Sequence, residues 1–299
     1  MTGQVWLIVN PVAGGGRGAR HAAVAARRLT DAGIRCRLVS AASAEETSRS
    51  AVEAVDDGAS AVVACGGDGT VHAVLQPLVG TAIPLGIVAG GSGDDIAASL
   101  GFTTSGAEAI ADSLRDMVMT GTLRSVDVAE AITHDGTSRY FVGVLTTGFD
   151  SSVNERANAM SRLRGQRYNI AMVRELAAFR PLDYRVTLDG DTVSGPGMLV
   201  SVGNGPRYGG GMLICPEARP DDGVLDVTWL GTLSKPALIR LFPRVYRGTH
   251  VDHPAVRTFR GRTLSIDAPG QVAYADGERL GPLPVDVEIR AAALRVLSA

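Results

Sequence analysis

Short apolar runs alternate with segments of helical spacing in the first part of the chain. The apolar runs cover residues 5–9, 34–39, 61–65 and 84–88, and the helical segments cover about 19–32, 44–56 and 71–78. Strands that are apolar throughout and joined by short links are typical of a parallel sheet covered by helices on both faces. Ligands of such sheets bind beyond the carboxyl ends of the strands. The pattern therefore predicts an α/β domain with a ligand site at one edge of its sheet.

From about residue 124 the pattern changes to that of alternating strands. The expected strands cover 125–133, 139–145, 184–188, 197–202, 224–230, 263–266, 272–274 and 285–289. The pairs Asp135-Gly136 and Asp189-Gly190 favour tight hairpins. We expect an antiparallel β-sandwich, so the fold class is α/β plus β, with domains at 1–124 and 125–299. Whether the last residues pack back on the first domain is left open.

Composition narrows the function classes. The chain has 299 residues, 45% of them hydrophobic, which is enough for a core in each domain, and a net charge of −2, which argues against a nucleic-acid partner. No apolar run approaches the roughly 18 residues that span a bilayer. The start of the chain lacks the pattern of a signal peptide, and three widely spaced cysteines fit reduced thiols. We expect a cytoplasmic protein.

The third apolar run continues directly into Gly66-Gly67-Asp68-Gly69-Thr70. Glycines at a strand end let a ligand approach bare backbone. The next helical segment places the amides of Gly69 and Thr70 at a helix N-terminus, where phosphate binds. A carboxylate there would repel phosphate unless a divalent cation lay between them, so Asp68 indicates Mg²⁺-nucleotide chemistry. The alternative is a glycine-rich turn in which Asp68 only caps the helix.

Two further glycine-rich loops, at residues 10–18 and 89–93, also follow strands and should converge with the first. Lys235 is the only lysine. Because P-loop enzymes and protein kinases both need a lysine on the phosphates, both classes are excluded. Residues 14–19 fit the G-x-G-x-x-A pattern of dinucleotide-binding oxidoreductases, but the second strand ends without the acidic residue that binds the ribose, so this alternative is weak.

Several motifs resemble those of the diacylglycerol-kinase and sphingosine-kinase type of lipid kinase. GGDGT is the signature of that family and is shared with NAD kinases and phosphofructokinase-like enzymes. The more specific motifs are, in the family's order, Asn10-Pro11-Val12-Ala13-Gly14, Gly91-Ser92-Gly93-Asp94-Asp95, Asn204-Gly205, Tyr208-Gly209-Gly210-Gly211, Asp221-Asp222-Gly223-Val224-Leu225-Asp226 and Asp276-Gly277-Glu278. The resemblance implies a phosphofructokinase- or NAD-kinase-like nucleotide-binding domain, followed by the β-sandwich. NAD kinases lack the last two of these motifs.

By this resemblance, the glycine-rich loops bind ATP. The implied nucleotide-binding residues are Asn10, Pro11, Val12, Ala13, Gly14, Gly66, Gly67, Asp68, Gly69, Thr70, Ser92 and Glu278. Asp94 stands where the family has Asn, and its extra charge could be offset by an arginine or by more metal. Alternatively, Asp94 and Asp95 only cap the helix that follows.

The resemblance also implies two magnesium sites and a catalytic base. A structural Mg²⁺ would be bound by Asp222 and by the carbonyl groups of Arg219 and Val224. Asp68, Asp95 and Asp127 would hold the catalytic Mg²⁺, mostly through water, although a strand-edge carboxylate describes Asp127 equally well. Asp276 would accept the proton of the acceptor hydroxyl. Outside the motif series, Asp276-Gly277 would be interpreted as a hairpin turn.

Two segments, 154–180 and 235–247, mix arginines with apolar residues at helical spacing. Such helices can lie on an anionic membrane, and equally can be half buried and half solvated. The sequence thus favours an ATP- and Mg²⁺-dependent kinase that phosphorylates diacylglycerol or a related lipid at the membrane surface as a peripheral protein. The alternatives are a kinase for a sphingoid base or a soluble dinucleotide, and a non-catalytic lipid or nucleotide sensor. The nucleotide preference and a homodimer are left open.

Overall fold

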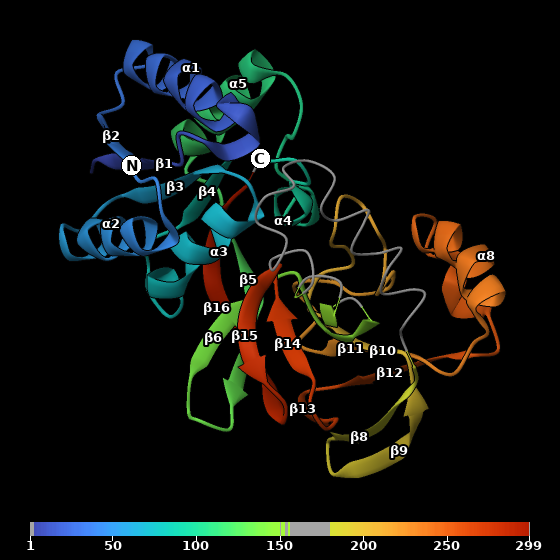
Figure 1. The fold of residues 1–299 in the computed structure, drawn as a ribbon. Coiled ribbons are helices and arrows are strands. Elements are labelled where there is room, and N and C mark those ends of the chain that lie inside the picture. Colours follow the sequence, from blue (N-terminus) through green and yellow to red (C-terminus); the bar gives the residue numbers. More distant parts are fainter. Residues whose placement is uncertain (1–2, 150, 153–154, 156–179, 299) are drawn as a thin grey trace. The chain divides into compact units, whose positions relative to one another are not determined.

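The computed structural model describes residues 3–149, 151–152, 155 and 180–298, and it contains two compact units (Figure 1). The N-terminal unit consists of Met1–Val128, Pro220–Gly223 and Arg290–Ala299, and the sandwich unit consists of Ala129–Arg219 and Val224–Ile289. Two long strands, β5 (Leu123–Thr133) and β16 (Val285–Leu297), begin in one unit and continue into the other.

The N-terminal unit contains the predicted parallel sheet. Its strands are β1 (Val5–Val9), β2 (Cys36–Ser40), β3 (Ala61–Gly66) and β4 (Leu85–Ala89), in the order β2-β1-β3-β4. The end of β16 lies beyond β4, where Val296 pairs with Leu85 in parallel. Side chains of β1, β3 and β4 are buried throughout, as their apolar sequences predict.

Helices cover both faces of this sheet. They are α1 (Arg17–Asp31), α2 (Ala44–Asp56), α3 (Asp68–Leu75), α4 (Asp95–Ser99) and α5 (Ala107–Thr120), with short 3₁₀ turns η1 (Ala13–Gly15) and η2 (Gln76–Leu78). In Figure 1, α1 and α5 lie on one face, and α2 and α3 on the other. Helix α2 begins and ends as predicted, and Ser43 caps it by accepting a hydrogen bond from the amide of Glu46. The helix α5 was not predicted.

The sandwich unit has two layers of antiparallel strands. One layer is a six-stranded sheet in the order β12-β11-β10-β7-β14-β15, and the other contains β16, β13, β8 and β9, with β5 paired to β6. The bounds are β6 (Ser138–Phe141), β7 (Val144–Gly148), β8 (Leu182–Leu188), β9 (Asp191–Gly197), β10 (Leu199–Gly203), β11 (Leu225–Leu230), β12 (Val256–Gly261), β13 (Thr263–Asp267), β14 (Val272–Ala275) and β15 (Glu278–Pro282). Helix α8 (Lys235–Val245) and the turn η3 (Thr249–Asp252) complete the unit.

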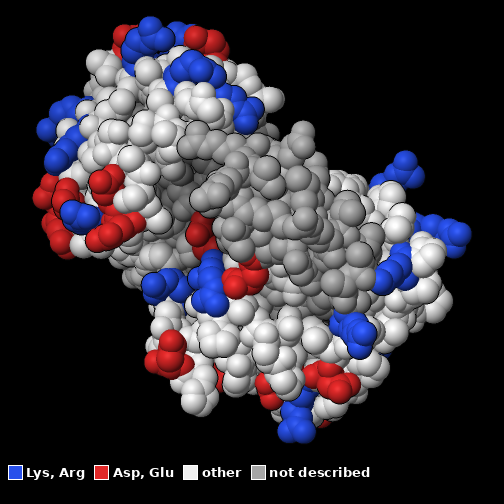
Figure 2. Space-filling model, in the orientation of Figure 1, with Lys and Arg blue, Asp and Glu red and all other residues white. Residues whose placement is uncertain are grey.

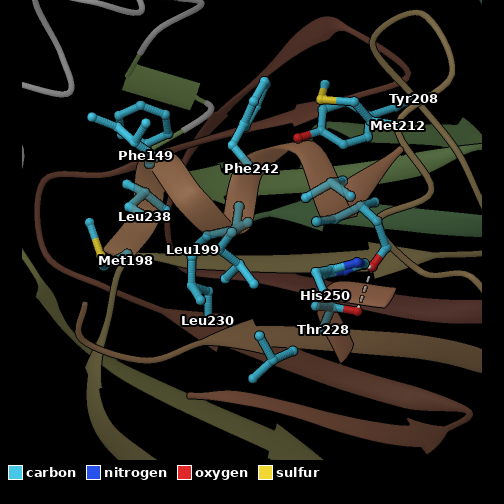
Figure 3. A pocket seen from close by; sticks show the side chains of 15 residues that line it. Phe149, Met198, Leu199, Tyr208, Met212, Thr228, Leu230, Leu238, Phe242 and His250 are labelled. Carbon is cyan, nitrogen blue, oxygen red and sulfur yellow. Dashed lines mark hydrogen bonds between the residues drawn. The ribbon is translucent and has the colours of Figure 1, made fainter. Parts of the chain in front are cut away.

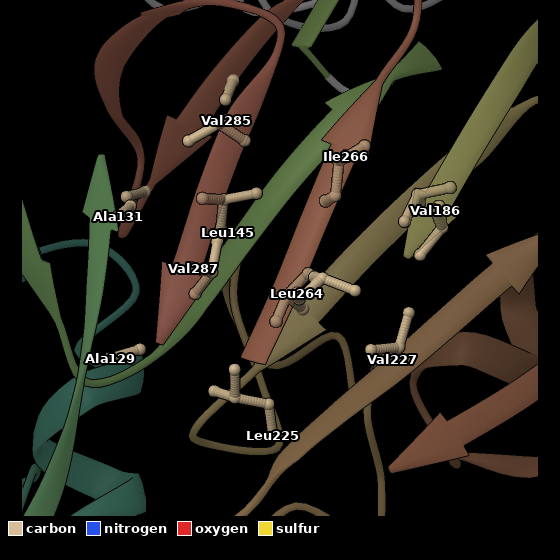
Figure 4. Close-up of a cluster of buried hydrophobic side chains, with 14 of the residues drawn as sticks. Ala129, Ala131, Leu145, Val186, Leu225, Val227, Leu264, Ile266, Val285 and Val287 are labelled. Atoms are coloured by element: carbon tan, nitrogen blue, oxygen red, sulfur yellow. The ribbon is translucent and has the colours of Figure 1, made fainter. Parts of the chain in front are cut away.

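Inward-facing side chains from both layers form the core of the sandwich. Figure 4 shows Leu145 and Val227 from the six-stranded sheet among Val186, Ile266 and Val287 from the other layer. Each strand contributes alternate residues, as expected where one face of a strand is buried. The predicted β-sandwich is therefore confirmed.

The predicted single strand 139–145 was wrong, because the chain forms two strands there. β6 ends at Phe141 and pairs with β5, whereas β7 begins at Val144 and pairs with β10 and β14 of the six-stranded sheet. The intervening residues, Val142 and Gly143, donate their backbone amides to the carboxylate of Asp276 instead of to a neighbouring strand. An apolar sequence alone gives no sign of this change of layer. The strands β9, β12 and β15 were not predicted either.

Candidate active site

The three glycine-rich loops of the N-terminal unit contact one another, as predicted. The amide of Gly90 donates to the carbonyl of Gly66 at 2.9 Å. A Cβ atom on Gly67 would lie 2.9 Å from the Cα of Gly91, and one on Gly90 would lie 2.5 Å from the Cα of Gly18. Side chains at these positions would push the loops apart. The backbones therefore meet at the carboxyl ends of β1, β3 and β4, where glycines leave the backbone uncovered by side chains toward a ligand.

Asp68 is the first residue of α3, and Gly67 occupies the position before the helix. The amides of Gly69 and Thr70 thus lie in the first turn, as predicted. The Oδ1 atom of Asp68 accepts a hydrogen bond from the amide of Ile96 at 2.9 Å, at the start of α4. The carboxylate therefore caps a different helix from its own, and it lies near the N-terminal ends of two helices, where negative charge is stabilised.

Asp94 adopts a left-handed conformation, with φ of 57°, just before α4. Its Oδ1 atom accepts a hydrogen bond from the amide of Gly91 at 2.8 Å, which an Asn oxygen could do equally well. Burial raises the pKa of Asp94, while the Gly91 hydrogen bond and the nearby positive charge of Arg17 oppose that rise. Arg17 also donates to the carbonyl of Gly91. Arg17 thus lies close to the extra negative charge of Asp94, in agreement with the possibility that an arginine offsets this charge.

The remaining predicted nucleotide-binding residues lie on the same loops. Asn10 follows β1, and its Oδ1 atom accepts the amide of Val12 at 3.1 Å, which shapes the turn into η1. Ser92 is exposed in the loop before α4, and Asp95 is buried at the first position of that helix. The structure therefore brings all the predicted nucleotide-binding residues together except Glu278, which lies in the sandwich unit at the start of β15.

Asp127 is buried in β5, and its carboxylate joins two other segments of the N-terminal unit. Its Oδ2 accepts the amide of Gly223 and its Oδ1 accepts the amide of Ala292, each at 2.7 Å. The amide of Asp127 donates to the carbonyl of Pro220, also at 2.7 Å. Among the described residues, no three Asp, Glu, His or Cys side chains lie close enough to bind one ion directly. A role for Asp127 near metal, if water-mediated, stays a prediction.

The predicted structural metal site lies on the loop between Arg219 and Val224. Asp222 is exposed on this loop. The Oδ2 atom of its neighbour Asp221 lies 3.8 Å from Nη1 of Arg124. Gly223 has a φ of 73°, which turns the chain sharply before β11. One carboxylate and backbone carbonyls are oxygen donors of the kind that Mg²⁺ prefers, so the donor set fits the ion.

Asp276 occupies the tight turn between β14 and β15 with Gly277, and both residues have positive φ, 51° and 84°. Its Oδ1 accepts the amide of Gly143 at 2.9 Å, and its Oδ2 accepts the amide of Val142 at 3.2 Å. The backbone amide of Asp276 donates to the carbonyl of Val144 at 3.0 Å. Two hydrogen bonds therefore orient the carboxylate and a third holds the backbone of Asp276, a residue that is 9% exposed.

The Asn204-Gly205 motif positions the same segment. The amides of both residues donate to the carbonyl of Gly143, at 3.0 and 2.9 Å, and the side chain of Asn204 donates to the carbonyl of Val142. Sequence reasoning missed the role of residues 142–143, because their contribution comes from backbone atoms. The two distant motifs at 204–205 and 276–278 thus converge on one short stretch of chain.

An apolar pocket of about 250 Å³ lies in the sandwich unit between α8 and residues of the sheet strands β10, β11 and β12 (Figure 3). Among the described residues, those that line it are Phe149, Met198, Leu199, Tyr208, Met212, Ile214, Thr228, Leu230, Leu238, Ile239, Leu241, Phe242, Val245, His250 and Val256. Helix α8 contributes its apolar face, at helical spacing of three and four residues. That spacing was a signal in the sequence, but the pocket itself was not predicted.

The polar side chains of this pocket are largely occupied by the protein. The hydroxyl of Thr228 donates to the carbonyl of Ile214 at 2.8 Å, and the same carbonyl lies 3.1 Å from Nε2 of His250, which must therefore carry the proton. Burial lowers the pKa of His250. The pocket consequently offers mostly hydrocarbon to a ligand.

Comparisons with known proteins agree with these features. Residues 4–131 match the family model described as the diacylglycerol kinase catalytic domain, and residues 143–298 match the YegS C-terminal NAD kinase beta sandwich-like domain. A diacylglycerol kinase of Mycobacterium tuberculosis is 39% identical over 297 residues, covering 99% of this chain and 95% of the relative. A protein of Stenotrophomonas maltophilia named "probable lipid kinase YegS-like" is 30% identical over 212 residues, covering 68% of this chain and 67% of the relative. A crystal structure described as a diacylglycerol kinase from Bacillus anthracis has a similar fold, with a TM-score of 0.72 at 20% identity, covering 99% of this chain and 97% of that one.

Proposed function

Because the chain belongs to the diacylglycerol kinase family, we propose that it transfers the terminal phosphoryl group of ATP, with Mg²⁺, to the hydroxyl of diacylglycerol or a related membrane lipid. The family makes the protein a kinase. The acceptor, the nucleotide, the metal and the residue roles are the proposed part.

The apolar pocket is the observation that carries the choice of a lipid acceptor. A soluble dinucleotide presents ribose, base and phosphate groups that need hydrogen-bonding partners, and an apolar lining would leave them unsatisfied. A hydrocarbon chain gives up no hydrogen bonds on entering such a lining and gains from leaving water. The pocket also lies in the same unit as Asp276. These features favour a lipid over a soluble dinucleotide.

In the proposed reaction, the acceptor hydroxyl oxygen forms a bond to the terminal phosphorus of ATP, the bond from that phosphorus to its bridging oxygen breaks, and ADP leaves. The proton of the hydroxyl passes to the carboxylate of Asp276. The amides of Val142 and Gly143 keep that carboxylate oriented. Such a base typically contributes about 10²–10⁴-fold to the rate.

The glycine-rich loops support the nucleotide part of the proposal. Their amides, the N-terminus of α3 and the guanidinium of Arg17 provide positive electrostatics without a lysine. Bound Mg²⁺ would neutralise phosphate charge. The carboxylates proposed to hold it, mostly through water, are those of Asp68, Asp95 and Asp127. The structural ion is proposed to bind Asp222 and the carbonyls of Arg219 and Val224.

No helix among the described residues is long and apolar enough to cross a bilayer. The protein would therefore reach its acceptor at the membrane surface, as a peripheral protein. Of the two basic segments predicted from the sequence, residues 156–179 lie outside the described residues, whereas 235–247 contains α8.

Acceptor assays test the proposal. The protein is incubated with radiolabelled ATP and Mg²⁺, and with micelles of diacylglycerol, micelles of a sphingoid base, or NAD in solution. We expect label to enter the organic phase with diacylglycerol. Label only with the sphingoid base would assign the protein to that alternative, and label only on NAD would contradict a lipid acceptor. Nucleotide binding without transfer to any acceptor would indicate a sensor.

A further inference from the structure

Helix α8 has two faces of different chemistry. Its inner face, with Leu238, Leu241 and Val245, is buried and lines the apolar pocket. Its outer side exposes large side chains, among them Ile239, which is 55% exposed, and Tyr246 just after the helix, which is 48% exposed. Because Ile239 also lines the pocket, the exposed edge of α8 is continuous with the pocket wall.

The outer side of α8 is positively charged. Residues 235–247 carry four cationic side chains, those of Lys235, Arg240, Arg244 and Arg247, and no acidic one. The guanidinium of Arg244 interacts with neighbouring residues of the protein: its Nη2 lies 3.7 Å from Oδ2 of Asp252 and donates to the carbonyl of Thr249. Arg240 and Arg247 are exposed. On the face drawn in Figure 2, Lys and Arg gather over α8 with no Asp or Glu among them.

We propose that the outer side of α8, formed by Ile239, Arg240, Tyr246 and Arg247, is the surface that docks on an anionic bilayer. This inference rests on the proposed function only in taking a membrane lipid as the acceptor. Anionic headgroups complement the arginines, and an aliphatic and an aromatic side chain can enter the headgroup boundary beside them. The net charge of the whole chain, −2, gives no general attraction to such a surface, so the attraction must be local.

Docking by this edge would serve the pocket directly. A lipid chain leaving the bilayer would meet Ile239 first and then the apolar lining, without crossing water. Since exposing a long hydrocarbon chain to water is costly, a pocket edge held against the membrane lowers the barrier for entry. The inner and outer faces of one helix would thus serve the same substrate.

Vesicle sedimentation tests the proposal without nucleotide or turnover. The full chain is mixed with phosphatidylcholine vesicles that contain, or lack, phosphatidylglycerol, at low salt. We expect binding to the anionic vesicles only, and we expect Arg240→Gln/Arg247→Gln to lower the partition coefficient by about tenfold or more. A separate variant, Tyr246→Ser, should weaken binding while leaving its salt dependence unchanged.

A matched control is Arg27→Gln/Arg49→Gln, which removes the same number of charges from exposed positions on α1 and α2. This control should bind like the unmodified protein, and circular dichroism should show all variants folded. Equal loss of binding in both double variants would show that binding depends on the total charge of the protein and not on the α8 surface, and would overturn the proposal. Unchanged binding of the α8 variant would overturn it as well.

The outcome separates from that of the proposed function. If the protein docks through α8 but phosphorylates no lipid, the docking proposal stands and the proposed function is contradicted. If the protein and its α8 variant phosphorylate a short-chain diacylglycerol in water equally well, the proposed function stands. That conclusion does not depend on the result of the vesicle experiment.

Discussion

The carboxylate of Asp276 accepts a hydrogen bond of 2.9 Å from the amide of Gly143, where the chain passes from one layer of the sandwich to the other. The hairpin turn that carries Asp276 is thereby tied to residues 133 positions earlier in the chain. The base proposed for the reaction consequently has an orientation set by tertiary structure and not by its turn alone.

Asp276→Asn should lower kcat by about 10²–10⁴-fold and leave the Kd for nucleotide unchanged, because an amide cannot take the hydroxyl proton. It should also lower the free energy of unfolding by about 1–3 kcal/mol, since one of the two amides facing the carboxylate loses its acceptor. Steady-state kinetics, nucleotide titration and urea unfolding measure the three quantities.

The chain offers a matched control in Asp189. It lies in the same kind of turn, with φ of 48° and Gly190 at 97°, and its carboxylate accepts the amides of Arg262 and Thr263. Asp189→Asn should cost less stability, because its Oδ1 atom alone accepts both amides at an exposed position, and should keep full turnover. If both variants lost turnover equally, the effect at 276 would be structural.

Gly90→Ala should weaken nucleotide binding by about tenfold or more, because its Cβ would lie 2.5 Å from the Cα of Gly18 and force the loops apart. Overpacking of this kind typically costs about 1–3 kcal/mol of stability. Gly33→Ala is the control, since its Cβ meets no atom within 4 Å and only its positive φ of 76° is strained. Fluorescent-nucleotide titration of both variants distinguishes an effect of displaced loops from an effect of lost stability. Unchanged nucleotide affinity in Gly90→Ala would indicate that the nucleotide does not bind at these loops.

Met198→Phe should raise the KM for long-chain diacylglycerol by about tenfold, because the ring fills part of the apolar pocket that Met198 lines. Activity on a short-chain diacylglycerol should stay the same. Met119→Phe makes the same substitution at a position on α5 that is 61% exposed, and should change neither value. An unchanged KM for the long-chain lipid in Met198→Phe would argue that chains bind elsewhere.

His250 should make stability depend on pH. Its pKa is lowered in the folded protein by burial, so below the ordinary value of 6.5 the unfolded chain binds a proton more readily than the folded one. The free energy of unfolding should therefore fall as the pH drops below about 6.5, by at most about 1.4 kcal/mol per pH unit from this residue. His250→Gln, which can keep the hydrogen bond to Ile214, should show a flatter profile between pH 7 and 5. Identical profiles in urea unfolding would contradict a titrating His250.

Adding Mg²⁺ without nucleotide should raise the thermal stability, if the loop at Asp222 holds a structural ion. At an ion concentration 100 times the Kd, binding to the folded state alone contributes about 2.7 kcal/mol. Asp222→Asn should abolish this increase, and Asp221→Asn, beside Arg124, should retain it. A rise of the same size in Asp222→Asn would place the ion at other ligands.

Features encoded in local sequence could be predicted, and those that depend on backbone contacts between distant segments could not. A helix soon after Gly67 follows from an apolar strand, two glycines and helical spacing, although it begins at Asp68 and not at the expected residue 71. By contrast, the amides of Val142 and Gly143 carry no side-chain signature of their bond to Asp276. Asp68 illustrates an intermediate case, because a capping role was foreseen while its partner, Ile96 on another helix, was not.

The pocket shows why a concave site resists prediction from one sequence. Each lining residue looks like an ordinary core position, and α8 in particular has the spacing of any half-buried helix. Only the three-dimensional packing leaves a space between that helix and the sheet. The sequence-based hypothesis of a lipid acceptor came from motifs, and the pocket supports it independently of them.

The pairing of Val296 with Leu85 has a consequence for synthesis of the protein. The strand that pairs with the outer edge of β4 is synthesised about two hundred residues after β4 itself. During synthesis, the backbone groups on that edge of β4 therefore stay unpaired. Unprotected flanks of this kind recruit other chains. A fragment ending at residue 124 should therefore self-associate when expressed alone, and adding a separate peptide that spans 285–298 should restore its solubility.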